Sequence, residues 1–385
     1  PFPLPVRVLI AFGYFLSFEY SVIARGYVLV VLGLFLLASR DGPPTWVDGL
    51  LLAMVANATA HGFLLAGTVF AVRFRELPRA ARIVAGLGLC FVGWQLWPPP
   101  DGQMEPFEFL RNVAYLPRFA PLALFPDHDS RPFQVAGVVM MVLAALTLYR
   151  RPRSLALLLL GWGALYSFFV FVYVTGLRHV GLLALWLVFV LWEDRVRGTG
   201  PSPALPIQWA FRFSVALSLA ISLATAIRTW RIERTSSFSE GSVMASFLRD
   251  RGLALAPIAA HGAPHCESVL AYLPPRMFWY PGIRAYGSYM KWDAAYALGG
   301  RLAPRVAAQR VRAAFSRDQW PLLLFNEELT DPESLGFRLL FSTPGNISQH
   351  RLPHTDERFF LYEPLPAEEA TGPSLPRAAA TAPPR

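Results

Sequence analysis

The pattern of hydrophobic and polar positions divides the chain into two parts. Residues 1–230 hold long apolar runs, whereas residues 231–385 alternate short apolar and polar segments as soluble proteins do. The apolar runs lie at roughly 4–18, 26–39, 46–60, 62–73, 83–97, 133–149, 155–174, 180–193 and 207–227. Since a full crossing takes about 20 apolar residues, we predict a multi-spanning α-helical membrane protein with about 8–9 spans, several of them tilted, kinked or partly re-entrant.

Two stretches of the N-terminal part admit more than one structure. Residues 46–73 are either one long helix or a hairpin that turns near Ala60-His61-Gly62. Residues 98–131 read as a long outer loop, rich in proline and aromatic residues. Within this loop, PFEFLRNVAYL (106–116) forms either a short helix on the membrane surface or an irregular cap over the helices.

Arginine-rich loops predict the orientation of the spans. Residues 72–82, 150–153 and 195–197 are strongly basic, which is typical of cytoplasmic loops. The loop 98–131, the turn 175–179 and the chain after residue 227 then lie outside. We therefore expect a multi-pass protein of the bacterial inner membrane, with its C-terminal domain in the periplasm.

The C-terminal part is predicted to be a soluble α/β domain over residues 231–365. Helices are expected at 239–251, 265–273 and 303–316, and strands at 253–261, 276–281, 287–293, 321–327, 336–342 and 358–365. No glycine-rich phosphate loop follows a strand, which argues against a nucleotide site. Residues 366–385, rich in proline and alanine, are predicted to be disordered.

Composition narrows the class of partners. The chain has a net charge of +9, yet only 16% of its residues are charged, and Lys291 is its one lysine. The arginines lie in short loops rather than on one soluble face, so the sequence predicts no nucleic-acid partner. Cys90 and Cys266 lie in different parts of the chain and are expected to be free. The chain opens with Pro1 and has no signal peptide pattern, so we expect an N-terminal portion to be missing.

Ionisable residues among apolar helices are costly and therefore candidates for function. Glu19 and Arg25 are six residues apart, so they share a cavity only if the helix breaks between them. Arg178 and His179 lie at an outer turn directly before a helix, an arrangement that favours phosphate or another anion. The alternatives are an interfacial ion pair or snorkelling arginine for the first pair, and a simple basic turn for the second.

A third group lies in FPDHDSRP (125–132). Asp127 and Asp129, with His128 between them, offer ligands for a divalent metal such as Mg²⁺ or Mn²⁺, although the same residues are common in exposed turns. His61, at the tip of the possible hairpin, is a further candidate on the outer face.

Short motifs resemble bacterial GT-C membrane glycosyltransferases, in the branch related to protein mannosyltransferases and aminoarabinose transferases. The segment EYSVIARGY (19–27) resembles the family's segment that ends in Arg-x-Tyr. Three further segments are similar to an outer turn, an Arg-His-x-Gly element and the start of the periplasmic domain: TAHGFLLAG (59–67), RHVGLL (178–183) and FWYPGIRAYGSYMKWD (278–293).

The resemblance implies a GT-C-like fold and an enzyme that moves a sugar from a polyprenyl-phosphate carrier to an acceptor glycan, lipid or protein at the periplasmic face. It places Arg25, Arg178 and His179 on the phosphate side, with Tyr27 and His61 as further substrate-binding residues. In the family, an acidic catalytic loop lies between the first two helices, and no matching segment precedes Pro1.

Three explanations of that departure stay open. The acidic loop has been lost from this chain, or Glu19 or Asp127 serves as the catalytic acid, or the protein is not an active transferase. The alternative function is a non-catalytic membrane protein whose periplasmic domain binds a partner or an envelope polymer. A transporter is less favoured because the sequence has no obvious internal repeat.

Overall fold

The computed structural model divides the chain into two compact units, each of which is described by itself. The helical unit comprises Pro1–Pro99 and Glu105–Ile232, and the C-terminal unit comprises Glu233–Arg385 with Pro100–Met104. The structure describes residues 2–22, 26–97, 109–172, 176–198, 200–201, 203–235, 239–289, 291, 293–300, 302–344 and 358–366. The predicted disordered tail, apart from its first residue, lies outside these ranges.

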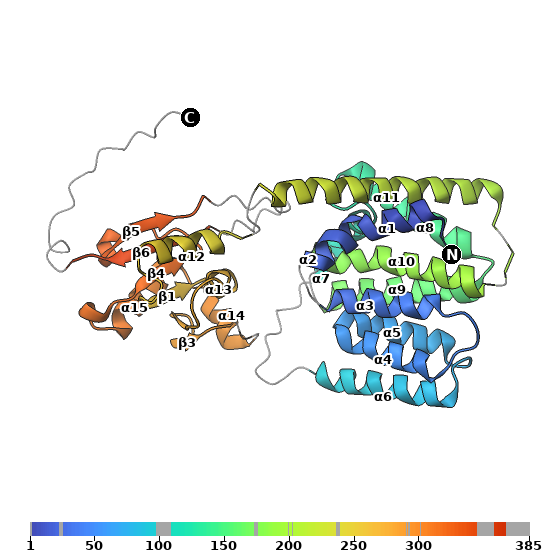
Figure 1. Ribbon diagram of the computed structural model, residues 1–385, viewed down its shortest axis with the longest axis horizontal. Helices are drawn as coiled ribbons and strands as arrows, with labels where there is room; N and C mark the ends of the chain where they lie inside the picture. The colour runs from blue at the N-terminus through green and yellow to red at the C-terminus, as the bar shows by residue number, and fades with distance from the viewer. Residues whose placement is uncertain are drawn as a thin grey trace. The chain divides into compact units, whose positions relative to one another are not determined.

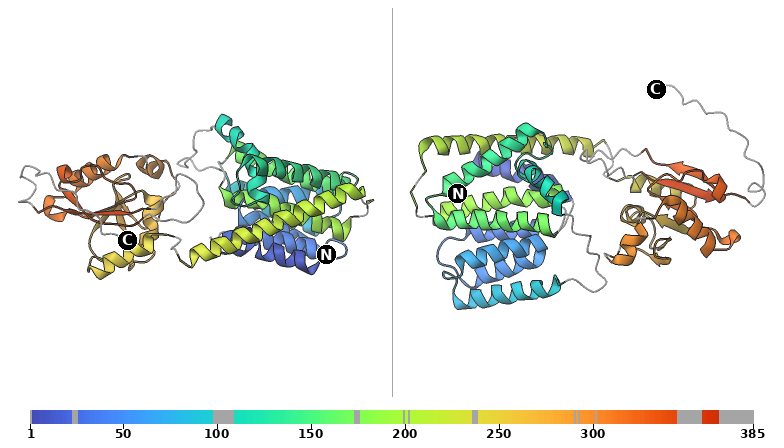
Figure 2. Two further views of the ribbon diagram at one scale, coloured as in Figure 1. Left: turned by 90° about the horizontal axis from the view of Figure 1, so that it is seen from above. Right: turned by 180° about the vertical axis from the view of Figure 1, so that it is seen from behind.

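The helical unit is a bundle of helices that lie side by side (Figure 1). Its elements are α1 (Leu4–Phe12), the π-helix η1 (Phe15–Glu19), α2 (Tyr20–Val22), α3 (Tyr27–Ser39), α4 (Trp46–Ala58), α5 (Ala60–Arg73), α6 (Arg79–Gln95), α7 (Phe109–Leu124), α8 (Arg131–Leu148), α9 (Pro152–Phe171), α10 (Leu177–Arg197) and α11 (Leu205–Glu233). Helix α11 crosses the others obliquely (Figure 2).

Among the described residues, α8, α9 and α11 are long and apolar enough to cross a membrane. Helices α3, α4 and α5 are also apolar but have only 13, 13 and 14 residues. At 1.5 Å per residue each reaches about 20 Å, short of the ~30 Å hydrocarbon core. The structure therefore supports a membrane protein, with three helices of spanning length rather than the full predicted set.

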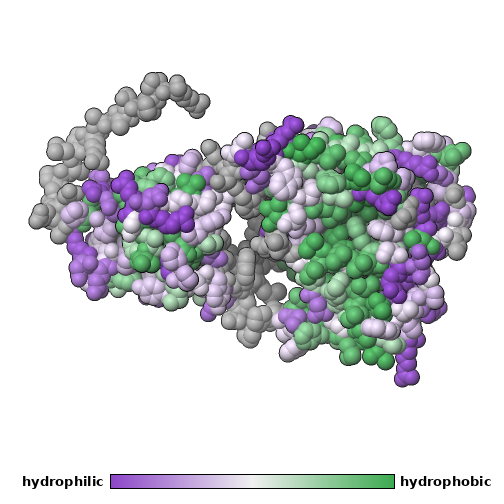
Figure 3. Space-filling model, viewed as in Figure 1, coloured by the Kyte–Doolittle hydropathy of each residue, from purple (hydrophilic) through white to green (hydrophobic). Residues whose placement is uncertain are grey.

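The surface of the helical unit is also typical of a membrane protein. Figure 3 shows apolar side chains gathered in a continuous area over its helices. Many large apolar side chains are exposed there, including Leu87, Phe91 and Trp94 of α6, Val135, Val138 and Val142 of α8, and Trp209, Phe213 and Leu217 of α11. A water-soluble monomer rarely exposes so much contiguous apolar surface, whereas lipid would cover it.

Residues 46–73 form a hairpin rather than one helix. Helix α4 ends at Ala58 and α5 begins at Ala60, with Thr59 in an extended conformation between them. The Thr59 hydroxyl accepts a hydrogen bond from the Gly62 N–H at 2.9 Å, which caps α5. A Cβ at Gly62 would lie 2.2 Å from the Val55 carbonyl oxygen, so only glycine permits this close turn.

The expected outer loop 98–131 contains a helix of the bundle, which is a correction to the prediction. Helix α7 runs over 16 residues despite Pro117 and Pro121, and Phe119 and Leu124 are buried. Gly137 of α8 admits the backbone of Pro121, since a Cβ there would lie 2.7 Å from the proline nitrogen. Apolar packing thus overrides the loop-like composition of this segment.

Helix α10 packs closely against α9 and the π-helix. Trp186 lies over Gly161, and its indole N–H donates to the Leu157 carbonyl at 3.1 Å. Trp162 donates in return to the Leu183 carbonyl at 3.0 Å. Small residues let membrane helices approach in this way, and the paired indoles fix the position of α10 within the bundle.

The C-terminal unit is built on a six-stranded sheet in the order β3-β2-β1-β4-β6-β5. β1 is parallel to β2 and β4, and the remaining pairs are antiparallel. The elements are α12 (Gly241–Asp250), β1 (Ile258–His261), α13 (Ala263–Leu270), β2 (Phe278–Tyr280), β3 (Ala285–Gly287), α14 (Ala294–Gly300), α15 (Pro304–Ala314), η2 (Arg317–Gln319), β4 (Leu322–Phe325), η3 (Glu333–Leu335), β5 (Phe337–Ser342) and β6 (Phe360–Pro364).

Helices cover both faces of this sheet, which makes the unit an α/β sandwich. Alternate strand residues face opposite sides, so Ala260 packs with α12 and α13 while Ala259 packs with α15. The predicted α/β architecture is confirmed, with shorter strands. The expected strand at 287–293 is wrong, because β3 ends at Gly287 and residues 288–289 form bends. Both cysteines are free, as predicted.

Candidate functional site

Three helices of the bundle begin at the same place. Tyr27 opens α3, His61 is the second residue of α5 and His179 is the third residue of α10. The ring centroids of His61 and His179 are 5.0 Å apart, and Tyr27 lies 5.8 Å from His61 and 5.7 Å from His179. Each helix N-terminus carries a partial positive charge of about +0.5. We call these residues the ring triad; the arrangement favours an anion beside it.

A local hydrogen bond holds the imidazole of His179 in place, and aromatic packing holds that of His61. His179 Nδ1 accepts a hydrogen bond from the Gly176 N–H at 2.9 Å, so its side chain caps its own helix. His61 packs against Phe168 and Phe169 at 4.8 and 5.8 Å between ring centroids. Its Nε2 atom is buried and has no hydrogen-bond partner within the described part of the chain. A ligand group can therefore satisfy that nitrogen.

Glu19 is the last residue of the π-helical turn η1. The carboxylate is 5% exposed and accepts a hydrogen bond from the Tyr14 hydroxyl at 2.7 Å. π-Helical turns are rare and often occur at functional sites because they redirect one side chain. The preceding residues pack tightly as well, since Phe15 fills the space that a side chain at Gly181 of α10 would occupy.

Tyr20 connects the surroundings of Glu19 to the ring triad. Its ring stacks on Tyr27 with 5.6 Å between centroids, and its hydroxyl donates to the Arg178 carbonyl at 2.7 Å. Arg178 is half-buried, and its Nε–H has no hydrogen-bond partner among the residues that the structure describes. A carboxylate, a cation and three helix N-termini thus meet at one end of the bundle.

The two aspartates predicted to bind a metal have other partners. Asp127 pairs with Arg228 of α11 at 3.0 Å, and Asp129 pairs with Arg118 of α7 at 3.4 Å. His128 Nδ1 lies 2.8 Å from the Pro126 carbonyl. The three side chains therefore turn to different partners, and the described residues contain no group of three metal-ligating side chains. This arrangement does not fit a bound metal ion.

Most of the predicted site residues lie together. The structure brings Glu19, Tyr27, His61, Arg178 and His179 to one end of the helical unit, and the loop that carries Asp127 reaches the same end because α8 starts there and α11 finishes there. Arg25 lies outside the described residues. The sequence did not single out Tyr14 and Tyr20; their only signal is their spacing of five residues and one residue from Glu19.

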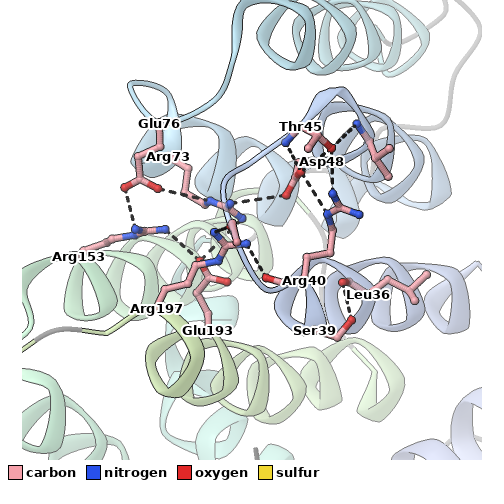
Figure 4. A network of polar contacts seen from close by, with 12 residues as sticks. Leu36, Ser39, Arg40, Thr45, Asp48, Arg73, Glu76, Arg153, Glu193 and Arg197 are labelled. Carbon is pink, nitrogen blue, oxygen red and sulfur yellow. Dashed lines mark hydrogen bonds and ion pairs between the residues drawn. The ribbon is translucent and has the colours of Figure 1, made fainter.

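A buried ionic network occupies the opposite end of the bundle, and its buried acids, Asp48 and Glu193, also escaped the sequence analysis. Arg73 is fully buried within 4 Å of three acids: Asp48 (3.7 Å), Glu76 (3.9 Å) and Glu193 (3.8 Å). Glu193 also binds Arg153 and Arg197 at 3.0 and 3.4 Å (Figure 4). The three arginine-rich loops therefore meet at one place, where acids from α4 and α10 neutralise them.

No protein-family model, no curated protein and no solved structure matches the chain.

Proposed function

We propose that the protein is a glycosyltransferase of GT-C type, which moves a sugar from a polyprenyl-phosphate carrier to an acceptor at the periplasmic face of the membrane. The observation that carries this proposal is the convergence of the N-termini of α3, α5 and α10 on Tyr27, His61 and His179. A lipid phosphate is an anion, and converging helix N-termini are a general means of binding one.

In the proposed reaction, Arg178 and the ring triad bind the departing phosphate. When the bond between sugar and phosphate breaks, negative charge develops on the departing phosphate. Among the described residues, the Arg178 Nε–H and the His61 Nε2 atom have no hydrogen-bond partner, so the guanidinium and the Nε2-protonated tautomer of His61 can donate to the phosphate. Preorganised donors of this kind act most strongly where water is excluded, as it is beside Phe168 and Phe169.

In the proposed reaction, Glu19 activates the hydroxyl group of the acceptor. A carboxylate within reach of an acceptor hydroxyl can accept its proton as the new glycosidic bond forms. Tyr14 holds one carboxylate oxygen of Glu19 and thereby orients the other. Asp127, whose charge also acts on the Tyr14 hydroxyl, is the second candidate acid, and its pairing with Arg228 makes Glu19 the better one.

The proposed orientation puts the ring triad outside and the ionic network inside. Arg73, Arg153 and Arg197 gather at the network end, and basic residues favour the cytoplasmic side. Helix α11 finishes at the opposite end, which leads the chain toward a periplasmic C-terminal unit. In this proposal the short helices α3, α4 and α5 complete the predicted set of spans where the bilayer thins around the protein.

A divalent metal at Asp127 and Asp129 stays a prediction from the sequence, and the proposed reaction does not use it. Mg²⁺ or Mn²⁺ at Asp127 and Asp129 would have to displace Arg228 and Arg118 from these carboxylates. The reaction proposed above needs only the cation Arg178 and the helix N-termini to balance the phosphate charge.

Reconstituted protein tests the proposal. Purified chain in lipid nanodiscs is given polyprenyl-phosphate-linked sugars, and release of free polyprenyl phosphate is measured with total envelope material as acceptor. We expect Arg178→Ala to reduce release by roughly 100-fold, the usual effect of removing one preorganised charge. The matched control is Arg79→Ala, an exposed arginine at the start of α6, which should keep full activity.

The alternative function gives a different result in the same assay. A non-catalytic membrane protein that binds a partner or envelope polymer releases no polyprenyl phosphate, whichever carrier is offered. Equal release of polyprenyl phosphate by the wild type and Arg178→Ala would show that Arg178 does not take part in the reaction. The transferase proposal would then depend on Glu19 and the ring triad.

A further inference from the structure

A second pocket lies within the C-terminal unit, at the carboxyl ends of β1 and β2. Its lining includes His261 and Gly262 after β1, Tyr280 and Gly282 after β2, and Tyr296 of α14. The chain leaves β1 toward α13 on one face of the sheet, and after β2 it later reaches α15 on the other face. Ligands of open α/β sheets commonly bind outside the carboxyl ends of the strands.

Glycines keep this pocket open. A Cβ at Gly282 would lie 2.5 Å from the Cα of Gly299, so the two backbones touch and leave no space for side chains. Gly262 has a φ of +83°, a conformation that side chains disfavour. The enclosed space of the pocket is about 20 Å³, which is room for one group the size of a water molecule. That suits a single hydroxyl at the edge of a small ring.

The Tyr280 side chain brings a buried hydroxyl to the pocket. Tyr280 is 3% exposed, and its hydroxyl has no hydrogen-bond partner among the described residues. A buried hydroxyl without a partner destabilises a fold, so such groups usually serve a ligand or an ordered water. Its near neighbours are polar as well, because Glu267 and Tyr296 both act electrostatically on it.

The neighbouring groups indicate what the ligand offers. The Glu267 Oε1 atom is buried and has no partner in the described part of the chain, and burial raises the pKa of this carboxyl. A ligand hydroxyl can donate to the Glu267 oxygen and accept from the Tyr280 hydroxyl. An anionic ligand could not accept from Glu267 once that carboxyl is ionised, and would be repelled by it. Tyr289, 62% exposed and close enough to act on Tyr296, adds an accessible aromatic ring.

We propose that the carboxyl ends of β1 and β2 form a carbohydrate-binding site, which takes the hydroxylated edge of one sugar ring. Tyr280 supplies the buried hydrogen bond, and the exposed Tyr289, which lies near Tyr296 of the pocket lining, supplies aromatic surface for the apolar face of the ring. The site lies wholly within the C-terminal unit and does not rest on the transferase proposed for the helical unit.

The test uses the full chain in nanodiscs and a panel of methyl glycosides: mannoside, glucoside, galactoside and N-acetylglucosaminide. Saturation-transfer NMR should detect binding of at least one at millimolar concentration. Tyr280→Phe, which removes one oxygen, should weaken that binding by roughly fivefold to tenfold. Because the hydroxyl has no hydrogen-bond partner among the described residues, the same change should leave the unfolding temperature of the C-terminal unit unchanged or raised.

Tyr362→Phe is the matched control. The Tyr362 hydroxyl is also buried, but it accepts a hydrogen bond from the Leu329 N–H at 2.7 Å on the other face of the sheet. This variant should lower the unfolding temperature and keep glycoside binding. The proposal is overturned if no glycoside binds to the wild-type chain, or if Tyr280→Phe binds as tightly as the wild type.

Discussion

The imidazole rings of His61 and His179 are stacked, with 5.0 Å between their centroids and 14° between their planes. The two residues are far apart in the chain, and each lies in the first turn of its own helix. Two stacked imidazoles cannot both carry a positive charge without strong repulsion at this distance. His179 is the neutral one, because its Nδ1 accepts a hydrogen bond from the Gly176 N–H and its Nε2 therefore carries the ring proton.

His61→Phe is expected to separate the chemistry of this pair from its packing. The phenyl ring keeps the contacts with Phe168 and Phe169, and it removes a buried nitrogen that lacks a partner among the described residues. Thermal stability in detergent should be unchanged or higher. Carrier turnover in the nanodisc assay should fall roughly tenfold or more. Phe74→Leu, an exposed position at the other end of α5, is the control and should keep turnover. Full activity of His61→Phe would show that the imidazole has only a packing role.

Arg178→Ala is expected to stop transfer without disturbing the bundle. The Arg178 Nε–H has no hydrogen-bond partner among the described residues. The Tyr20 hydroxyl donates to the backbone carbonyl of Arg178, which the substitution keeps. The variant should therefore insert and purify as the wild type does, with turnover lower by roughly 100-fold. Poor insertion of Arg178→Ala, with normal turnover in the molecules that do insert, would contradict this role.

Arg73→Met is expected to destabilise the bundle strongly. Arg73 has no exposed surface, and its removal leaves Asp48 and Glu193 buried with less compensating charge. Breaking a buried ion pair typically costs about 3–5 kcal/mol. Thermal unfolding in detergent should show this loss, and adding Glu193→Gln to Arg73→Met should recover part of it. The exposed Arg150 provides the control Arg150→Met, which should unfold as the wild type does.

Chelation is expected to leave transfer unchanged. Asp127 and Asp129 already pair with Arg228 and Arg118, so neither carboxylate awaits a cation. Turnover is measured in nanodiscs before and after treatment with EDTA, and again after Mg²⁺ or Mn²⁺ is returned. Loss of turnover with EDTA and recovery with Mg²⁺, absent in Asp127→Asn, would establish the metal site that the sequence suggested.

His261 is expected to make the C-terminal unit less stable at mildly acidic pH. Burial lowers the pKa of this imidazole below its ordinary value of 6.5, although the Leu302 carbonyl and Glu327 act against burial. As pH falls below about 6.5, the unfolded chain takes up a proton that the folded unit does not, so stability falls. Hydrogen-exchange protection factors of the β1 amides should therefore decrease between about pH 7.5 and pH 5.5.

His261→Gln should flatten this pH dependence, because glutamine does not titrate and can still donate to the Leu302 carbonyl. Glu267, whose pKa is raised by burial, acts in the opposite direction at lower pH and is present in both proteins. Its contribution therefore cancels in the comparison. An equal decrease of the protection factors in wild type and His261→Gln would assign the pH dependence to another group.

The sequence by itself determined the two-part organisation, because apolar runs and alternating patterns depend only on neighbouring residues. It predicted most elements of the C-terminal unit, such as α15 and β4, from local periodicity. For residues 46–73 it left one long helix and a hairpin near Ala60-His61-Gly62 as alternatives, and the structure places the turn at Thr59, whose hydroxyl caps α5.

Only the tertiary structure decided what these elements bring together. The composition of residues 98–131 is typical of a loop, yet packing against Gly137 makes α7 a helix of the bundle. His61 and His179 meet because α5 and α10 begin side by side, and Arg73 meets Glu193 at the other end for the same reason. Contacts between distant segments depend on how helix faces pack, and spacing along a single chain does not encode that packing.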